Sequence, residues 1–241
     1  MKLEELKLHN LHFIGVGGSG MSGLARIALA MGFRVSGSDA KESDAVKDLL
    51  SLGAEIKVGH DAANIRAGQV LIVSSAISAN NPEIIRAKEL NLNILTRAEA
   101  LALFMSNKKS IAVAGTHGKT TTTSMLTVAL QGLGLDPAFA IGGTINRGGT
   151  NAHYGSGEYF VAEADESDGS FLTYKPYGAI ITNIELDHVD NFPNIEAIKN
   201  LFSEFINSIQ TNGFLVAGTS SPYVKEILSR VTRTDLKIIT Y

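Results

Sequence analysis

Two glycine-rich loops, each placed between a short apolar run and a segment of helical periodicity, constrain the fold of this chain most strongly. The first is GVGGSG at 15–20, and the second is GTHGKT at 115–120. Each has the residues of a nucleotide-binding turn between a parallel strand and a helix. Two such units predict two α/β domains with parallel sheets, and 241 residues are enough to build both.

Short apolar runs alternate with helical segments along the whole chain, as is typical of parallel strands covered by helices. The clearest helix is expected over 195–209, where apolar residues form one stripe. The polar stretch SNKKS at 106–110 suggests a boundary between domains at 1–106 and 107–241. Strands are expected at 12–16, 34–38, 69–73, 110–114, 159–162, 178–182, 214–217 and 237–240.

Composition excludes several classes of function. The chain has 21 Lys and Arg against 24 Asp and Glu, and this balance lacks the basic footprint of a nucleic-acid-binding protein or of one that binds anionic membranes. It has no cysteine, which removes disulfides, thiolate zinc sites and thiol nucleophiles. The charged start MKLEELKLHN has no apolar signal core, and no apolar run reaches the length of a membrane span. A soluble, cytoplasmic protein is expected.

The first loop satisfies the pattern G-x-G-x-x-G. Its glycines allow backbone N–H groups to approach a pyrophosphate at the positive end of the following helix. Asp39 ends the next strand, 19 residues after Gly20, where a carboxylate hydrogen-bonds ribose hydroxyls. The same pattern serves NAD, FAD and other diphosphate nucleotides, and it also occurs as a plain packing turn, so the loop alone does not identify the nucleotide.

The second loop indicates a nucleoside triphosphate. Lys119 is placed to reach the terminal phosphates, and the Thr120 hydroxyl is a ligand for Mg²⁺. The loop departs from the general P-loop pattern because Val113 stands where the first glycine belongs. This departure favours a distinct subfamily over an ordinary kinase or GTPase.

Acidic residues follow the strand expected at 159–162, and a second polar group follows the strand at 178–182. Glu163, directly after the first of these strands, takes the position of a magnesium-binding acid, although a solvated acidic turn is the alternative. His188 either joins that metal site or is an ordinary surface histidine. The two polar groups consist of Glu163, Asp165, Glu166 and Asp168, and of Asn183, Glu185, Asp187, His188 and Asp190.

Six ordered motifs resemble the Mur ligase family across essentially the whole chain. The resemblance implies a Rossmann-like N-terminal domain, followed by a P-loop ATPase-type α/β domain that is incomplete at residue 241. A third, C-terminal domain, which would carry the amino-acid site, is expected to be absent. The motifs are GVGGSGMSGLA (15–25), SGSD (36–39), VSSAI (73–77), AGTHGKTTTT (114–123), AEADESD (162–168) and TNIELDHVD (182–190).

The resemblance implies ATP-dependent ligation of L-alanine to the lactyl carboxylate of UDP-N-acetylmuramate, through an acyl phosphate, in peptidoglycan precursor synthesis. The expected cofactors are ATP and Mg²⁺, and the expected partners are the UDP-sugar and L-alanine. The implied catalytic residues are Lys119 and His188. Three alternative functions remain open: the tripeptide-recycling ligase of the same family, an NAD(P)-dependent oxidoreductase, and a nucleotide-binding module without catalysis.

The same resemblance implies a set of binding residues on each domain. The UDP diphosphate would lie against Gly17, Gly18, Ser19, Gly20 and Met21, the ribose or uridine side against Asp39, and the uridine against Ser74, Ser75, Ala76 and Ile77. The ATP phosphates would lie against Gly115, Thr116, His117, Gly118, Lys119, Thr120 and Thr121, with Asn183 near the nucleotide. Mg²⁺ would be held by Thr120, Glu163 and His188.

Overall fold

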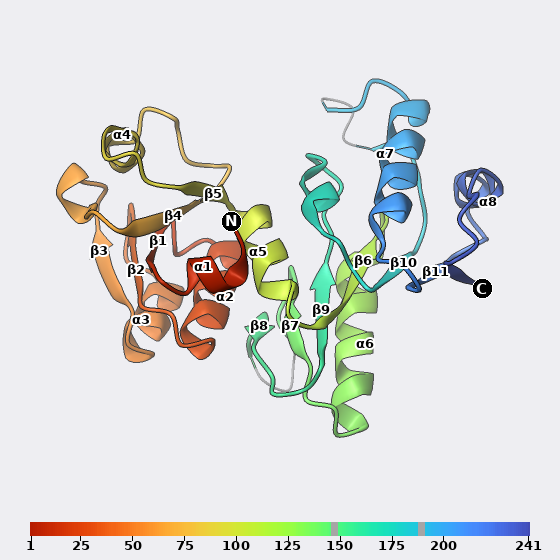
Figure 1. The fold of residues 1–241 in the computed structure, drawn as a ribbon, viewed down its shortest axis with the longest axis horizontal. Helices are drawn as coiled ribbons and strands as arrows, with labels where there is room; N and C mark the ends of the chain where they lie inside the picture. The colour runs from red at the N-terminus through yellow and green to blue at the C-terminus, as the bar shows by residue number, and fades with distance from the viewer. Residues whose placement is uncertain (146–148, 188–190) are drawn as a thin grey trace. The chain divides into compact units, whose positions relative to one another are not determined.

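A computed structural model describes residues 1–145, 149–187 and 191–241, and it divides into two compact units. The first unit contains Met1–Asn107 with Thr144–Tyr154, and the second contains Lys108–Gly143 with Gly155–Tyr241. Each unit has a sheet with helices packed against it, so the α/β class expected from the sequence is confirmed (Figure 1).

The sheet of the first unit has the strand order β3-β2-β1-β4-β5, and every neighbouring pair is parallel. From β1 the chain adds β2 and β3 on one side, and it then returns to add β4 and β5 on the other. Parallel connections are right-handed, so this reversal places helices on both faces of the sheet. The strands are β1 (Asn10–Ile14), β2 (Val35–Asp39), β3 (Glu55–Val58), β4 (Gln69–Val73) and β5 (Ile94–Thr96).

The helices of the first unit, including one short 3-10 helix (η1), lie before, between and after these strands. The elements are α1 (Leu3–Leu6), α2 (Ser19–Ala30), α3 (Asp44–Ser51), η1 (Ala62–Asn64), α4 (Pro82–Glu89) and α5 (Arg97–Met105). Helix α2 also packs against β8 (Ala152–His153), and the Asn151 side chain donates a hydrogen bond to the Ser19 carbonyl at 2.7 Å. In the core, the rings of Phe33 and Phe104 lie 5.7 Å apart.

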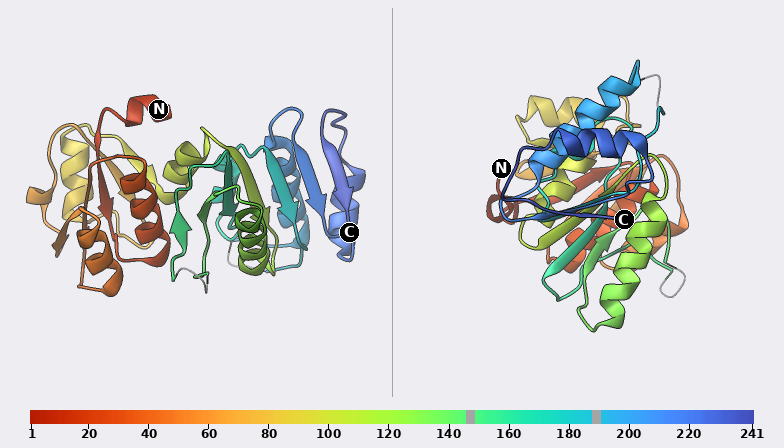
Figure 2. Two further views of the ribbon diagram at one scale, coloured as in Figure 1. Left: turned by 90° about the horizontal axis from the view of Figure 1, so that it is seen from below. Right: turned by 90° about the vertical axis from the view of Figure 1, so that its right-hand side faces the viewer.

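The sheet of the second unit has the order β12-β11-β10-β6-β9-β7, again with parallel neighbours. Helices α6 and α7 lie on opposite faces of it (Figure 2). The elements are β6 (Lys109–Ala114), α6 (Lys119–Gly132), β7 (Ala138–Ala140), β9 (Tyr159–Glu163), η2 (Ser170–Thr173), β10 (Gly178–Ile181), α7 (Ile195–Ser208), β11 (Phe214–Ala217), α8 (Pro222–Ser229) and β12 (Lys237–Thr240).

Helix α7 confirms the apolar stripe expected over 195–209. It begins after Asn194, whose side chain accepts from the Ala197 N–H, and it ends at Ser208. Phe202 and Phe205 are buried, and the Phe205 ring stacks on that of Phe171 with centroids 4.6 Å apart. Aromatic pairs of this kind add to the free energy gained by burying the rings.

The strand expected at 12–16 ends two residues earlier in the structure, at Ile14. Gly15 has a φ of +76°, a left-handed conformation that ends the extended strand. The N–H groups of Gly15 and Val16 both donate to the Ser38 carbonyl, which ties the first loop to the end of β2. The other expected strands are confirmed to within one residue at either end.

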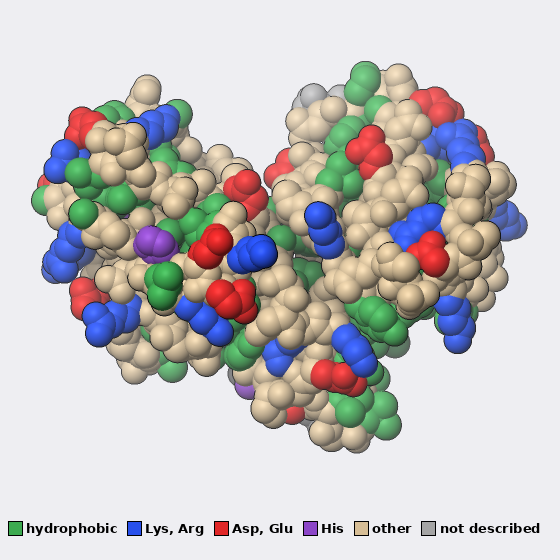
Figure 3. All heavy atoms as spheres, viewed as in Figure 1, with side chains coloured by type: hydrophobic (Ala, Val, Ile, Leu, Met, Phe, Trp, Pro, Cys, Tyr) green, Lys and Arg blue, Asp and Glu red, His purple; other side chains and the backbone are tan. Residues whose placement is uncertain are grey.

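Lys and Arg side chains are interspersed with Asp and Glu on the face drawn in Figure 3. This mixture of signs agrees with the net charge of −3. Within the ranges that the structure describes, no helix is both long and apolar enough to cross a membrane.

Candidate functional site

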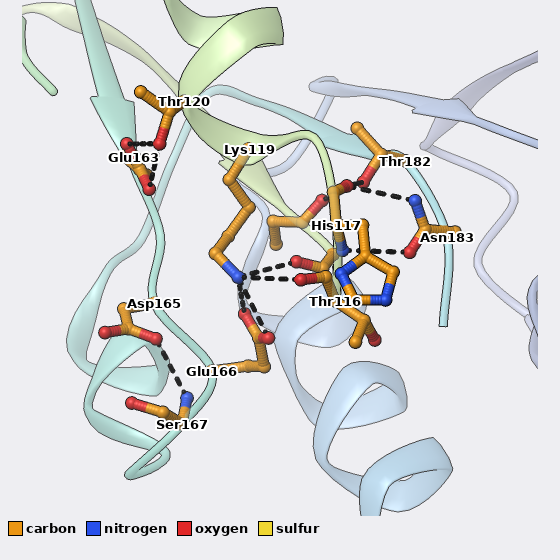
Figure 4. Close-up of polar contacts among 12 residues, drawn as sticks. Thr116, His117, Lys119, Thr120, Glu163, Asp165, Glu166, Ser167, Thr182 and Asn183 are labelled. Atoms are coloured by element: carbon orange, nitrogen blue, oxygen red, sulfur yellow. Dashed lines mark hydrogen bonds and ion pairs between the residues drawn. The ribbon is translucent and has the colours of Figure 1, made fainter. Parts of the chain in front are cut away.

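The second glycine-rich loop joins buried strand β6 to helix α6, and two of its glycines have backbone conformations that other residues rarely adopt. Gly115 and Gly118 have φ values of +136° and +81°, and Gly118 is the residue before the first helical turn. The loop is braced from the strand end after β10: His117 N donates to Asn183 Oδ1 at 3.0 Å, and Thr182 Oγ1 donates to the His117 carbonyl at 2.7 Å (Figure 4). Asn183 therefore lies at this loop and fixes its shape.

Lys119 begins α6, and its ammonium group lies against the inside of the loop. Its Nζ donates to the carbonyls of Gly115 at 2.8 Å and Thr116 at 3.3 Å, and to Glu166 Oε1 at 3.0 Å (Figure 4). Glu166 is only 3% exposed. Burial raises the pKa of its carboxyl above the usual value, against the opposing effect of the Lys119 ammonium. The contact with Glu166 therefore holds the lysine ammonium against the loop.

Thr120 and Glu163 are brought together from α6 and the end of β9. The Thr120 hydroxyl lies 3.0 Å from both carboxylate oxygens of Glu163, and Gly142 N donates to Glu163 Oε2 at 2.7 Å. A hydroxyl and a carboxylate are oxygen ligands of the kind that Mg²⁺ prefers, with phosphate and water completing its shell. These residues fit a magnesium ion. His188, the third ligand expected, lies outside the described residues, and among the described residues no group of three His, Asp or Glu side chains gathers as a metal site.

The acidic cluster after β9 divides into two kinds of residue. Asp165 Oδ1 accepts from Ser167 N at 3.1 Å and Asp168 Oδ1 accepts from Ser170 N at 2.9 Å, so both shape local turns. Glu163 and Glu166 instead face the glycine-rich loop (Figure 4). The acidic-turn interpretation thus applies to the two aspartates only.

The remaining residues of the second loop differ in their exposure. The His117 imidazole is 63% exposed, with Nε2 3.6 Å from a carboxylate oxygen of Glu185. Thr116 is buried, and its Oγ1 accepts from Glu185 N at 2.9 Å. Thr121 lies in the first turn of α6.

The first glycine-rich loop lies at the carboxyl end of β1, next to the end of β2. Gly17 N donates to Asp39 Oδ2 at 2.7 Å, and a side chain at position 17 would meet that oxygen at 2.9 Å. Gly18 precedes α2, which starts at Ser19 and includes Gly20. Met21 is 2% exposed, so its side chain packs in the core, and only its backbone is available to a phosphate. Asp39 therefore orders the loop directly.

The segment from Ser74 to Ile77 forms a turn after β4, beside the first loop. Ile77 N donates to the Ser74 carbonyl at 3.1 Å, and Ala76 N donates to Ser74 Oγ at 3.3 Å. The Ile77 side chain lies close to Gly15, where an added Cβ would meet Ile77 Cδ1 at 3.1 Å. The structure thus brings this turn, which includes Ser75, to the same edge of the sheet as the loop and Asp39.

Two acidic residues were not given a role by the sequence. One is Glu166, described above. The other is Glu83, in the first turn of α4, which is 0% exposed and accepts from Ser38 Oγ at 2.5 Å and Asn64 Nδ2 at 2.6 Å. In the sequence, Asn81 and Pro82 have the pattern of a helix start, which gives Glu83 no role beyond the first helical turn. Its partners lie 19 and 45 residues away in the chain, a distance that spacing does not predict.

Burial alone would raise the pKa of Glu83, but contacts with His12, Ser38 and Asn64 outweigh it and lower the pKa from 4.5 to about 2. A folded-state pKa below the unfolded value adds stability that is complete above about pH 4.5 and is lost as the pH falls through about 2. We expect the stability difference between the wild type and Glu83→Gln to shrink by up to about 3 kcal/mol over this range. Urea unfolding of both proteins at several pH values measures this difference. A difference in free energy of unfolding that does not change with pH would contradict the prediction.

Family models match both halves of the chain. The model described as "Mur ligase family, catalytic domain" matches residues 10–109, and "Mur ligase middle domain" matches residues 113–241. Among curated proteins, the UDP-N-acetylmuramate–L-alanine ligase of Renibacterium salmoninarum is 48% identical over 241 residues, covering 100% of this chain and 52% of the relative. The ligase of the same name from Streptomyces griseus is 50% identical over 232 residues, covering 95% of this chain and 50% of the relative.

The chain is also similar to solved structures of ligases that act on UDP-N-acetylmuramate. The crystal structure of UDP-N-acetylmuramate:L-alanyl-gamma-D-glutamyl-meso-diaminopimelate ligase from Neisseria meningitides has a TM-score of 0.86 and 31% identity, covering 96% of this chain and 78% of that one. UDP-N-acetylmuramate-alanine ligase MurC from Thermotoga maritima has a TM-score of 0.80 and 32% identity, covering 90% of this chain and 51% of that one. The chain spans about half the length of the curated relatives it matches. With both halves matched in sequence and in fold, the chain belongs to the Mur ligase family.

Proposed function

We propose that the chain is the UDP-sugar-binding and ATP-binding part of a ligase that joins L-alanine to the lactyl carboxylate of UDP-N-acetylmuramate. The observation that carries the proposal is the convergence of Lys119, Thr120 and Glu163 on one phosphate loop, in a chain 48–50% identical to ligases of that name. The first loop, with Asp39 and the turn from Ser74 to Ile77, offers a second nucleotide site.

In the proposed reaction the lactyl carboxylate attacks the γ-phosphorus of ATP, ADP leaves, and the alanine amine then displaces phosphate from the acyl phosphate. Lys119 would leave its carbonyl contacts to stabilise charge on the transferring phosphoryl group. The N–H groups at the start of α6 would bind the phosphates. Thr120 and Glu163 would hold a Mg²⁺, which when bound neutralises phosphate charge.

Two other functions have weaker support than the alanine ligase. The tripeptide-recycling reaction has support from the TM-score of 0.86 to the Neisseria structure, but identity to that protein is 31%, below the 48–50% to the alanine ligases. An NAD(P)-dependent oxidoreductase would leave the second loop and its acids without a role. We propose the alanine ligase, with both substrates and the cytoplasmic location following from that reaction.

The test is phosphate release by the full-length enzyme, measured with UDP-N-acetylmuramate, ATP and either L-alanine or the tripeptide L-alanyl-γ-D-glutamyl-meso-diaminopimelate. The proposal expects release that depends on L-alanine. Release that depends on the tripeptide alone would support the recycling reaction instead, and release with neither acceptor would favour a module without ligase activity.

Replacing Asp39 with alanine should weaken UDP-N-acetylmuramate binding and leave ATP binding unchanged. The substitution removes both a carboxylate partner for the nucleotide and the acceptor that orders Gly17 N. A lost charged hydrogen bond costs about 1.5 to 3 kcal/mol, or roughly 10- to 100-fold in affinity. Calorimetry with each nucleotide checks this, with Asp44→Ala as the control, because Asp44 is an exposed carboxylate near Lys47. Equal UDP-sugar affinity in the two variants would remove Asp39 from the site.

A further inference from the structure

One face of the first sheet changes from apolar to polar along its strands. On β1 and β4, Ile14 and Leu71 belong to a buried core cluster that also contains Ile84 of α4. His12 and Gln69 stand two residues earlier on the same two strands, and therefore on the same face. A face of a parallel sheet that is covered by helices is normally apolar. Core packing therefore does not explain these two polar residues.

The polar residues line a pocket at the amino ends of the strands, called here the amino-end pocket. It extends over β3, β2, β1 and β4, which lie side by side in this order (Figure 1). Its buried and half-buried polar lining includes His12, Ser36 and Gln69. The pocket has a volume of about 300 Å³, at the lower end of the range of roughly 300–1,000 Å³ for small-molecule sites. This volume suits a ligand of metabolite size.

Hydrogen bonds hold the polar lining of the amino-end pocket in place. Gln69 Nε2 donates to Ser36 Oγ at 3.2 Å, and Gln69 Oε1 accepts from Arg66 N at 2.7 Å. Ser36 Oγ also lies 2.9 Å from His12 Nδ1. A ligand that contacts this lining does not have to order these side chains, which lowers the entropy cost of binding.

Three exposed cationic side chains, Arg34, Lys57 and Arg66, also line the pocket. Within the residues that the structure describes, none of the three makes an ion pair or a side-chain hydrogen bond. Another exposed arginine of the same unit, Arg86, instead pairs with Glu89 at 2.9 Å. The pocket therefore gathers positive charge that has no partner, on a chain whose net charge is −3.

The amino-end pocket is separate from both glycine-rich loops. Asn10, which lines it, begins β1, whereas the first loop follows Ile14 at the other end of that strand. At about 3.3 Å per residue, the strand separates these two residues by roughly 13 Å. The second loop belongs to the other unit. None of the residues that line the pocket belongs to either loop.

We propose that the amino-end pocket binds a small phosphate monoester with hydroxyl groups, such as a sugar phosphate. A phosphate monoester carries about two negative charges at neutral pH, which three cations match better than the single charge of a carboxylate. Arg34, Lys57 and Arg66 supply charge-assisted donors to the phosphate. Glu55, the one acidic residue of the lining, accepts from a hydroxyl group. This site goes beyond the proposed function and does not depend on it.

The experiment is NMR titration of the isotope-labelled 241-residue chain with ribose 5-phosphate and, separately, with inorganic phosphate. The amides of Gly37, Lys57 and Asn64 report on the pocket, and those of Gly17 and Gly118 report on the two loops. Ribose 5-phosphate should shift the pocket amides and bind there at least about threefold more tightly than inorganic phosphate, because its hydroxyls add hydrogen bonds.

Arg34→Ala and Arg66→Ala should each weaken ribose 5-phosphate binding at the pocket amides by about tenfold, the effect of one lost charged hydrogen bond. Both side chains are exposed, so thermal melting should find both variants folded. Arg86→Ala is the matched control, because it removes an exposed arginine of the same unit that does not line the pocket. It should keep the wild-type affinity.

Two results would overturn the inference as a whole: shifts confined to the loop amides, or equal affinity of the Arg34→Ala and Arg86→Ala variants for ribose 5-phosphate. Equal affinity of the wild type for the two probes would overturn the assignment of a monoester and identify free phosphate as the occupant. None of these results depends on whether the chain binds UDP-N-acetylmuramate, so the proposed function is tested separately.

Discussion

Lys119→Ala in the full-length enzyme should lower ATP-dependent turnover by at least about 10²- to 10³-fold, while UDP-N-acetylmuramate affinity stays at the wild-type value. Losing one donor that stabilises transition-state charge typically costs about 3 to 4 kcal/mol. The lysine belongs to the second unit, and the proposed UDP-sugar residues belong to the first. ADP release measures turnover, and calorimetry measures the affinity.

The Lys119 experiment needs two controls. Lys109→Ala removes a half-exposed lysine from the same unit, paired with Glu158 at 3.0 Å, and should keep full turnover. Lys119→Ala/Glu166→Gln removes the buried carboxylate that the single change leaves without its cation, which matters because an uncompensated buried charge is destabilising. If the double variant is as stable as the wild type and still inactive, the loss belongs to catalysis. A parallel loss of UDP-sugar affinity would contradict the two-site assignment.

Gly115→Ala should disrupt the second loop and lower the free energy of unfolding by roughly 2 to 5 kcal/mol. An added Cβ would lie 2.0 Å from Thr182 Oγ1 and 3.0 Å from the Asn183 carbonyl, at a φ of +136°. The loop must shift, so ATP affinity should fall together with stability. Denaturant unfolding and ATP titration check the two effects.

Gly134→Ala is the control that separates the cost of a side chain at positive φ from the cost of the steric clash at position 115. Gly134 also has a positive φ, +74°, but an added Cβ there meets no atom within 4 Å. It should cost only about 1 to 2 kcal/mol and leave ATP affinity unchanged. Equal destabilisation by the two substitutions would mean that the contact with Thr182 is not what requires glycine at position 115.

The sequence predicts most of the strands because they are short apolar runs between turn signals. It misses β3, β5, β7 and the two-residue β8, for physical reasons that differ. The sequence of β3 is EIKV, with three exposed side chains, so it has no apolar run to detect. Strands β5 and β7 have three residues each, below the length at which a pattern emerges.

The candidate site also contains residues that the sequence predicts and residues that it does not. The loops, Lys119, Thr120 and Glu163 can be predicted because phosphate chemistry fixes their spacing from a strand end. Glu166 and Glu83 cannot, because each acts through a partner that only the fold brings near: Lys119 is 47 residues from Glu166, and Ser38 is 45 residues from Glu83. Burial, which raises the pKa of Glu166, and the hydrogen bonds that lower the pKa of Glu83 against its burial are likewise properties of the packed domain.

Thermal unfolding of the 241-residue chain with UDP-N-acetylmuramate, and separately with NADH, tests the central claim most directly. A ligand that binds only the folded state raises the melting temperature, by a stabilisation of about 2.7 kcal/mol at 100 times its dissociation constant. The account predicts that UDP-N-acetylmuramate raises the melting temperature and that NADH leaves it unchanged. Stabilisation by NADH, with none by UDP-N-acetylmuramate, would contradict it.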